Sequence, residues 1–182
     1  MILPFSTQIN GKPTYFVEKI WKGLKTQSPE SYIKLWATVS PEETTKQFPV
    51  DIDIYNEVKP KLHTIREDKK DRWKPGVMID FFINARQKNM FRFAPRIPVV
   101  STQEIRIKYT ESSSNTPLIY IEVFGKNDYK CLDTFNPKTK QSSFKLIEKL
   151  AINDGFDSVE DFFAYFNKDF TGKIIHWTDL RY

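Results

Sequence analysis

The sequence is short of the residues on which disulfide-linked and zinc-binding proteins depend. It has one cysteine, Cys131, and two histidines, His63 and His176. A single cysteine cannot form a disulfide within the chain, which is typical of proteins in a reducing cytoplasm. Three soft ligands scattered along the chain do not predict a zinc site, so we expect no metal or other cofactor. An all-carboxylate magnesium site stays open.

Long apolar runs are also missing. No stretch approaches the roughly 20 apolar residues of a membrane-spanning helix. The start, Met1 to Phe5, has neither the basic nor the apolar region of a secretory signal. There is no phosphate-binding loop, no dinucleotide fingerprint and no nucleophile elbow. We therefore expect a cytoplasmic protein that does not bind a membrane, and nothing points to the enzyme classes that carry those motifs.

What the chain does contain suits a globular protein with an anionic partner. Its 182 residues are 40% hydrophobic and 15% aromatic, enough for one domain, 1–182, with a sizeable core. The formal net charge is +5, but residues 59–108 alone hold 13 Lys and Arg against five acids. A basic middle predicts a polyanion as partner. The alternative is a generally basic surface that serves solubility.

The apolar periodicity predicts helices near both ends. Val17, Ile20, Trp21 and Leu24 recur at helical spacing after Thr14, which we expect to be the N-cap. A second helix is expected after Ser142 or Ser143, with Ile147, Leu150 and Ala151 buried and Asp154–Gly155 at its end. A third is expected after Ser158, burying Phe162, Phe163 and Phe166.

Between and after these helices the pattern predicts strands. We expect them at 77–83, 99–109, 118–124, 129–135 and 172–177, and residues 2–5 before the first helix are either a first strand or an arm. His176 lies near the end of the last apolar run, where a lone histidine is usually structural. The order of elements predicts an α+β protein, a mixed β-barrel flanked by helices.

The stretch around Lys61-x-x-Thr64-x-Arg66 is where chemistry concentrates. These three residues alternate out of phase with the apolar Leu62 and Ile65. They supply an ammonium, a hydroxyl and a guanidinium within six residues, which suits an anionic or carbonyl-bearing ligand. The alternative is a solvated basic turn without a ligand.

This stretch resembles a known family. The run from Lys61 to Asp68, followed by Trp73-Lys-Pro-Gly76 before an apolar strand, is similar to the motif of ASCH domains, which belong to the PUA-like superfamily. It is most similar to the small bacterial acetylcytidine amidohydrolases. Downstream, 153–156 and 158–162 resemble the acidic segment and the following helix of that family. The resemblance implies a PUA-like (ASCH) mixed β-barrel.

One part of the chain departs from the family pattern. The family passes almost directly from its first helix to the motif, whereas here residues 25–58 intervene as an insertion. Within it, Ser28-Pro29-Glu30 is typical of a helix start, and 50–54 alternates like a strand. The insertion would lie at the mouth of the barrel and serve either substrate choice or a partner.

The resemblance implies two functions. The first is a module that binds RNA or a modified nucleoside or nucleotide in a basic cleft. The cleft would be lined by the motif residues Lys61, Thr64 and Arg66. Further basic residues would lie beside them (Lys59, His63, Arg92 and Arg96). Arg92 stands between Phe91 and Phe93, an arrangement that suits stacking on exposed bases but equally suits plugging a barrel end.

The second implied function is an amidohydrolase that deacylates a modified nucleoside such as acetylcytidine. By the resemblance, Lys61 matches the activating lysine and Thr64 the proposed nucleophile. Asp154 falls where the family has a catalytic glutamate. A threonine hydroxyl needs a nearby base, which a desolvated lysine can provide. Asp154 is one methylene shorter than glutamate and also fits an ordinary helix C-cap.

Overall fold

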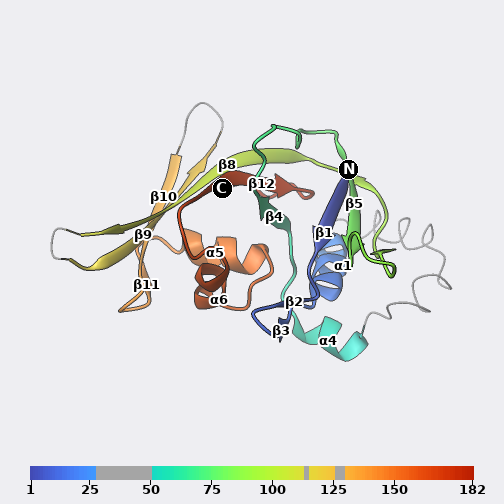
Figure 1. The fold of residues 1–182 in the computed structure, drawn as a ribbon, viewed down its shortest axis with the longest axis horizontal. Coiled ribbons are helices and arrows are strands. Elements are labelled where there is room, and N and C mark those ends of the chain that lie inside the picture. The colour runs from blue at the N-terminus through green and yellow to red at the C-terminus, as the bar shows by residue number, and fades with distance from the viewer. Residues whose placement is uncertain (28–50, 113–114, 126–129) are drawn as a thin grey trace.

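The computed structural model describes residues 1–27, 51–112, 115–125 and 130–182 (Figure 1). The helices are α1 (Phe16–Gln27), α4 (Ile52–Glu57), α5 (Leu146–Asn153) and α6 (Val159–Tyr165). The strands are β1 (Ile2–Phe5), β2 (Gln8–Ile9), β3 (Lys12–Pro13), β4 (His63–Arg66), β5 (Met78–Ile83), β6 (Phe91–Arg92), β7 (Ile97–Pro98), β8 (Ser101–Glu111), β9 (Pro117–Phe124), β10 (Lys130–Asn136), β11 (Gln141–Ser142) and β12 (Phe170–His176).

The strands form two main sheets. The larger is antiparallel, in the order β11-β10-β9-β8-β12-β4. In the smaller, β1 pairs in parallel with β5, which also pairs with β6 and β7, while β2 and β3 form a separate hairpin. Within the described residues these strands do not close into one hydrogen-bonded ring. The chain is a mixed α+β protein, as predicted.

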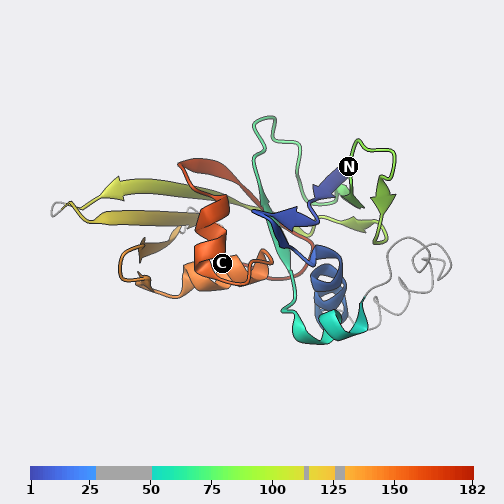
Figure 2. The same ribbon diagram turned by 60° about the horizontal axis from the view of Figure 1, so that its bottom comes forward.

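Two hydrophobic cores lie on either side of β12. Ile175 belongs to a core with β1, β5 and α1, whereas its neighbour Ile174 belongs to a core between the large sheet and helices α5 and α6. Adjacent residues of a strand point to opposite faces, so one strand can serve both cores. Figures 1 and 2 show α5 and α6 together under the large sheet and α1 beside β1.

The motif stretch, residues 61–66, lies between the two hydrophobic cores and connects them. Strand β4 pairs with β12 so that Thr64 lies opposite Ile175 and Ile65 opposite Ile174. Just before β4, the Lys61 amide donates to the Lys19 carbonyl oxygen of α1 at 2.9 Å. The next amide, of Leu62, donates to the carbonyl oxygen at the end of α5 at 2.8 Å. The motif is thus fixed by backbone bonds to a helix on each side.

Helix α1 has the predicted buried face but not the predicted cap. Its four periodic apolar residues are all buried. The Thr14 hydroxyl, however, donates to the Ser6 carbonyl oxygen at 2.7 Å instead of accepting from the helix. Tyr15, at φ 51°, precedes the helix, and its carbonyl accepts the first helical amide bond, from Lys19.

Of the insertion predicted at 25–58, the structure describes 25–27 and 51–58. The helix start predicted at Ser28 lies outside the described residues. The strand predicted for 50–54 is wrong from Ile52 onward, because α4 begins there. The Asp51 side chain accepts the amides of Asp53 and Ile54, and this N-cap stabilises a helical turn that outweighs the alternating pattern.

The strands predicted after the motif are confirmed, but one cap prediction is wrong. Lys145, at φ 58°, is the N-cap residue of α5 and gives no side-chain bond, so neither Ser142 nor Ser143 is the cap. The α6 cap is confirmed, with the Ser158 hydroxyl oxygen accepting from the Asp161 amide at 3.0 Å. Among the described residues, no helix is long and apolar enough to cross a membrane.

Candidate functional site

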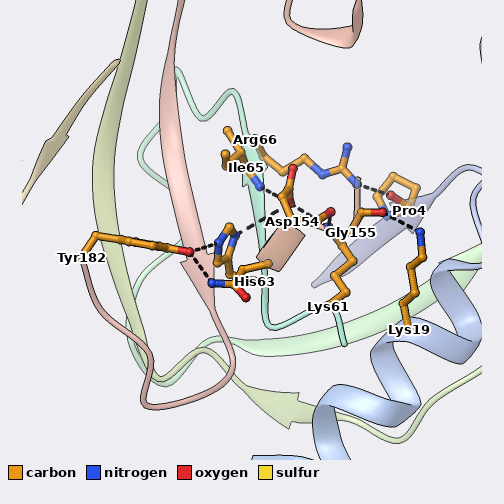
Figure 3. A network of polar contacts seen from close by, with 10 residues as sticks. Pro4, Lys19, Lys61, His63, Ile65, Arg66, Asp154, Gly155 and Tyr182 are labelled. Atoms are coloured by element: carbon orange, nitrogen blue, oxygen red, sulfur yellow. Dashed lines mark hydrogen bonds and ion pairs between the residues drawn. The ribbon is translucent and has the colours of Figure 1, made fainter. Parts of the chain in front are cut away.

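The centre of the site is an ion pair buried between α1 and α5. The Lys61 ammonium donates to Asp154 Oδ1 at 2.7 Å and also to the Asp154 carbonyl oxygen (Figure 3). Lys61 is 1% exposed and Asp154 is 4% exposed. Residues 93 positions apart, which the resemblance assigned to one site, therefore touch in the fold.

Asp154 is held in place by the way α5 ends. It is the C-cap residue, and its carboxylate oxygen also accepts the Ile65 amide of β4 at 3.1 Å. Gly155 follows at φ 88°, a conformation that glycine adopts without strain. A Cβ there would lie 2.9 Å from the Phe16 ring and 3.0 Å from the Lys61 side chain. Asp154 is thus a C-cap residue, as its sequence allowed, and it also contacts Lys61, while its catalytic role stays a prediction.

Aromatic rings and a glycine enclose Lys61. Its ammonium lies 4.8 Å from the centre of the Phe16 ring and 5.9 Å from that of Phe5. Both contacts are cation–π interactions, which gain strength where water is absent. On the backbone side, any side chain at Gly23 would collide with the Lys61 carbonyl oxygen. The sequence pattern carried no signal for these enclosing groups.

Burial shifts the protonation of both partners toward their neutral forms. It lowers the pKa of Lys61 to about 8, against the opposing attraction of Asp154. It likewise raises the pKa of Asp154 above the usual carboxyl range, against the opposing charge of Lys61. Lys61 can therefore lose its proton at a pH close to neutrality, which an exposed lysine does not do.

A second buried lysine lies beside the pair. The Lys19 ammonium of α1 donates to the Gly155 carbonyl oxygen at 2.8 Å and pairs with Asp157 at 2.7 Å. Its side chain is 3% exposed, whereas that of Asp157 is 74% exposed. Lys19 therefore fixes the turn after α5 at the residue next to the one that Lys61 holds.

The other two motif residues, Thr64 and Arg66, lie on one face of β4. Thr64 is buried opposite Ile175, which places its side chain on the face of the first core. Arg66, on the same face of β4, donates to the Pro4 carbonyl oxygen at 2.8 Å, and its guanidinium lies 5.5 Å from the centre of the Phe5 ring. Lys61 and Arg66 therefore share the Phe5 ring as a neighbour.

The structure gives Thr64 no direct bond to the ion pair. Among the described residues, its hydroxyl makes no hydrogen bond to Lys61 or Asp154. Catalytic hydrogen bonds are often formed only when substrate is bound, so this geometry leaves the predicted role of Thr64 as a hypothesis.

His63 lies on the other face of β4, against the carboxylate. It is fully buried; its Nε2 is 2.7 Å from the Tyr182 hydroxyl and its Nδ1 is 3.8 Å from Asp154 Oδ1 (Figure 3). The Tyr182 hydroxyl also accepts from the Asn153 amide at 2.9 Å. Burial lowers the pKa of His63 well below its usual value, so the ring is neutral. Sequence reasoning placed His63 at the site but missed Asn153 and Tyr182.

The remaining predicted cations lie elsewhere. Arg92 and Arg96 pair with Asp80 of β5, at 3.8 and 2.8 Å. Lys59 is exposed and lines a cleft of about 460 Å³ beside α5 and α6. Lys140 and Lys145 line the same cleft. The predicted set therefore divides into the buried centre and two exposed groups.

A small pocket lies beside the ion pair. It holds about 40 Å³ and is lined by the N-terminal hairpin, α1 and the turn after α5, including Phe16, Lys19, Gly155 and Asp157. Phe16 and Gly155 line this pocket and also neighbour Lys61. They are the residues between the pocket and the buried ammonium.

Asp68, which follows the motif, and His176 of β12 have structural roles. Asp68 accepts the amides of Arg72 and Trp73 at 3.0 and 2.8 Å and so shapes the loop before β5. His176 is fully buried in β12, with its ring centre 5.4 Å from that of His63. Within the described part of the chain, no three His, Cys, Asp or Glu side chains are grouped to hold a metal ion.

Comparison of the chain with protein-family models, with curated proteins and with solved structures gave no match. The resemblance to ASCH domains therefore rests on the motif residues of the sequence alone and stays a prediction.

Proposed function

We propose that this chain is an ASCH-like domain of the PUA-like superfamily that hydrolyses an amide bond of a small N-acylated substrate. The substrate we favour is a modified nucleoside of the acetylcytidine kind. One observation carries the proposal: the buried contact of 2.7 Å between Lys61 and Asp154. A lysine with a pKa lowered to about 8 by burial, next to a carboxylate, is typical of catalytic centres.

In the proposed reaction, neutral Lys61 accepts the proton of the Thr64 hydroxyl as the oxygen attacks the acyl carbon. The C–N bond then breaks, and protonated Lys61 returns the proton to the leaving amine. Water next attacks the acyl–threonine ester and yields the free acid and the original hydroxyl. General acid–base catalysis of this kind contributes about 10²–10⁴-fold.

Asp154 has a different role in this scheme. Its carboxylate holds the Lys61 ammonium in position and stabilises the protonated state that forms during attack. Arg66 lies on the face of Thr64 and supplies positive charge beside the acyl oxygen. Phe16 and Gly155 separate Lys61 from the neighbouring pocket, whose volume of about 40 Å³ holds water but not a nucleoside. Substrate entry therefore requires the Phe16 ring to move.

The proposal is tested with two variants, one that keeps the charge of Lys61 and one that keeps the volume of Thr64. Lys61→Arg keeps the positive charge beside Asp154, but an arginine does not lose its proton at neutral pH. Thr64→Val keeps the volume and removes the hydroxyl. We expect the wild type to release acetate from acetylcytidine, and both variants to lose at least about 10²-fold in kcat. Full activity of folded Thr64→Val would eliminate the threonine as nucleophile.

A second candidate function is binding of RNA or nucleotide without catalysis. The observation that favours it is the exposed cleft of about 460 Å³ that Lys59, Lys140 and Lys145 line. Phosphate contacts would supply affinity there. Three acids, Glu148, Asp157 and Glu160, line the same cleft and oppose a polyanion. The buried centre is therefore the stronger basis for function.

A further inference from the structure

The Tyr182 hydroxyl lies between two polar partners in a partly buried position. It accepts a hydrogen bond from Asn153 Nδ2 at 2.9 Å and lies 2.7 Å from His63 Nε2. A tyrosine hydroxyl carries one proton, and burial raises the pKa of Tyr182, so this proton is retained. With the Asn153 amide as donor, the hydroxyl proton is directed at His63.

This arrangement favours one tautomer of His63. With Nε2 as the acceptor of the Tyr182 hydroxyl proton, the neutral ring carries its own proton on Nδ1. Nδ1 has no hydrogen-bond partner within the described residues. It faces Asp154 Oδ1 at 3.8 Å, which is beyond hydrogen-bond length but close enough for the N–H dipole to favour the ionised carboxylate.

We propose that Asn153, Tyr182 and His63 form a positioning relay that holds His63 in its Nδ1–H form and directs this N–H at the Asp154 carboxylate. The catalytic consequence rests on the proposed hydrolase. When Lys61 gives up its proton, Asp154 loses the charge of its partner, and the His63 N–H together with the Ile65 amide keeps the carboxylate ionised. His63 and Tyr182 thus act through Asp154 and do not touch the reacting atoms.

The charges that face this carboxylate come from each element packed against it. Lys61 and Arg66 act on the carboxylate from the motif, and Lys19 of α1, which donates to the turn after α5, acts on Lys61. His176 faces His63 from β12 and is itself neutral, because burial lowers the pKa of His176 to about 3. Near neutral pH, neither ring adds a charge.

The first test measures which ring nitrogen of His63 is protonated, and it does not depend on enzymatic activity. The chain has only two histidines, so ¹⁵N-histidine labelling gives two imidazoles, and a His176→Gln variant assigns them. We expect His63 to show a protonated Nδ1 and an unprotonated Nε2, unchanged between pH 6 and 8. In Tyr182→Phe, Nε2 loses its donor and the signals should move toward a mixture of both tautomers. A protonated Nε2 in the wild type, or unchanged signals in Tyr182→Phe, overturns the relay.

The second test uses a matched pair of variants. His63→Asn places an amide N–H where Nδ1 lies, whereas His63→Gln reaches toward Tyr182 but offers no donor to Asp154. In the hydrolysis assay we expect His63→Asn to stay within about threefold of wild-type kcat, and His63→Gln to lose about 10–100-fold with little change in KM. Equal losses in the two variants overturn the role through Asp154. If the folded wild type hydrolyses nothing, the proposed function fails, and the labelling experiment still decides the relay.

Discussion

At the scale of single residues, the site depends on the balance between the desolvation cost of Lys61 and Asp154 and their mutual attraction. Removing two charges from water costs several kcal/mol per ion, and their attraction offsets this only with good geometry. Lys61 has two oxygen acceptors and two aromatic faces, and Asp154 has a further backbone donor. The burial cost of the pair is therefore partly offset while both partners are present, and it is larger when one partner is missing.

Removing one partner should destabilise the fold strongly. In Lys61→Met the Asp154 carboxylate stays buried without its cation, and we expect a loss of about 3–5 kcal/mol in the free energy of unfolding. Lys61→Met combined with Asp154→Leu removes both charges and should cost less than the two single changes together. Urea denaturation of all four proteins measures this coupling, and simple additivity would contradict the account.

The lowered pKa of Lys61 predicts a rise of stability in alkaline solution. Between its folded pKa of about 8 and its usual value of 10.5, the unfolded chain binds more protons than the folded one. Stability from this group therefore increases with pH in this window, by up to about 1.4 kcal/mol per pH unit.

A comparison of wild type with Lys61→Met isolates the contribution of this one group to the pH dependence. The difference in unfolding free energy between wild type and Lys61→Met should grow from pH 8 to pH 10. A difference that stays constant across this range would show that Lys61 titrates normally.

At this scale the sequence predicted more of the chemistry than of the surroundings. The motif identified Lys61, and the resemblance added Asp154, 93 positions away. The phenylalanines and Tyr182 that complete the site were not predicted, because their spacing reports only burial. An aromatic residue in a core looks the same in sequence whether it packs on leucine or on an ammonium.

At the scale of elements, the end of α5 determines the position of Asp154. Gly155 both adopts a left-handed conformation and leaves room for Phe16 and Lys61. Gly155→Ala should cost more than the roughly 1–2 kcal/mol of the backbone conformation alone, because its Cβ would also clash.

The matched control is Gly76→Ala, since Gly76 has φ 86° and no atom lies within 4 Å of the position that its Cβ would take. Thermal unfolding should show a larger loss for Gly155→Ala than for Gly76→Ala. Equal losses would mean that the contact with Phe16 and Lys61 is not tight.

The start of α5 depends on a residue from another element. Asp133 of β10 is fully buried, and its carboxylate accepts the amides of Phe144 and Ile147 at 2.9 and 3.1 Å. Asp133→Ala leaves these donors without partners, and we expect a loss of about 1–3 kcal/mol, measured by urea denaturation. Ser143→Ala, at the cap predicted from sequence, should cost less; the reverse order would restore the sequence prediction.

Local patterns explain which elements were predicted correctly. Helix α1 and the long strands have a strong period, so burial and secondary structure agree. Helix α4 was missed because Asp51 caps a stretch whose alternation resembles a strand, and the α5 cap was missed because it comes from β10. Caps supplied from a distant element leave no mark in the local sequence.

At the scale of the whole molecule, the site lies where the two cores meet. The motif stretch is bonded to α1 on one side and to the end of α5 on the other. The α+β class was predicted from the sequence, and so was the pairing of the neighbouring strands β8 and β9. The pairing of β12 with β4 and β8 was not predicted, because it joins segments far apart in the chain.

The most direct measurement of the central claim is acetate release from acetylcytidine and related N-acylated nucleosides between pH 6 and 9. The account predicts turnover by the wild type, with kcat/KM rising as Lys61 loses its proton and levelling above a pH of about 8. Lys61→Arg, confirmed as folded, should be inactive throughout. No turnover by folded wild type at any pH, or equal turnover by Lys61→Arg, would contradict the claim that Lys61 and Asp154 are a catalytic centre.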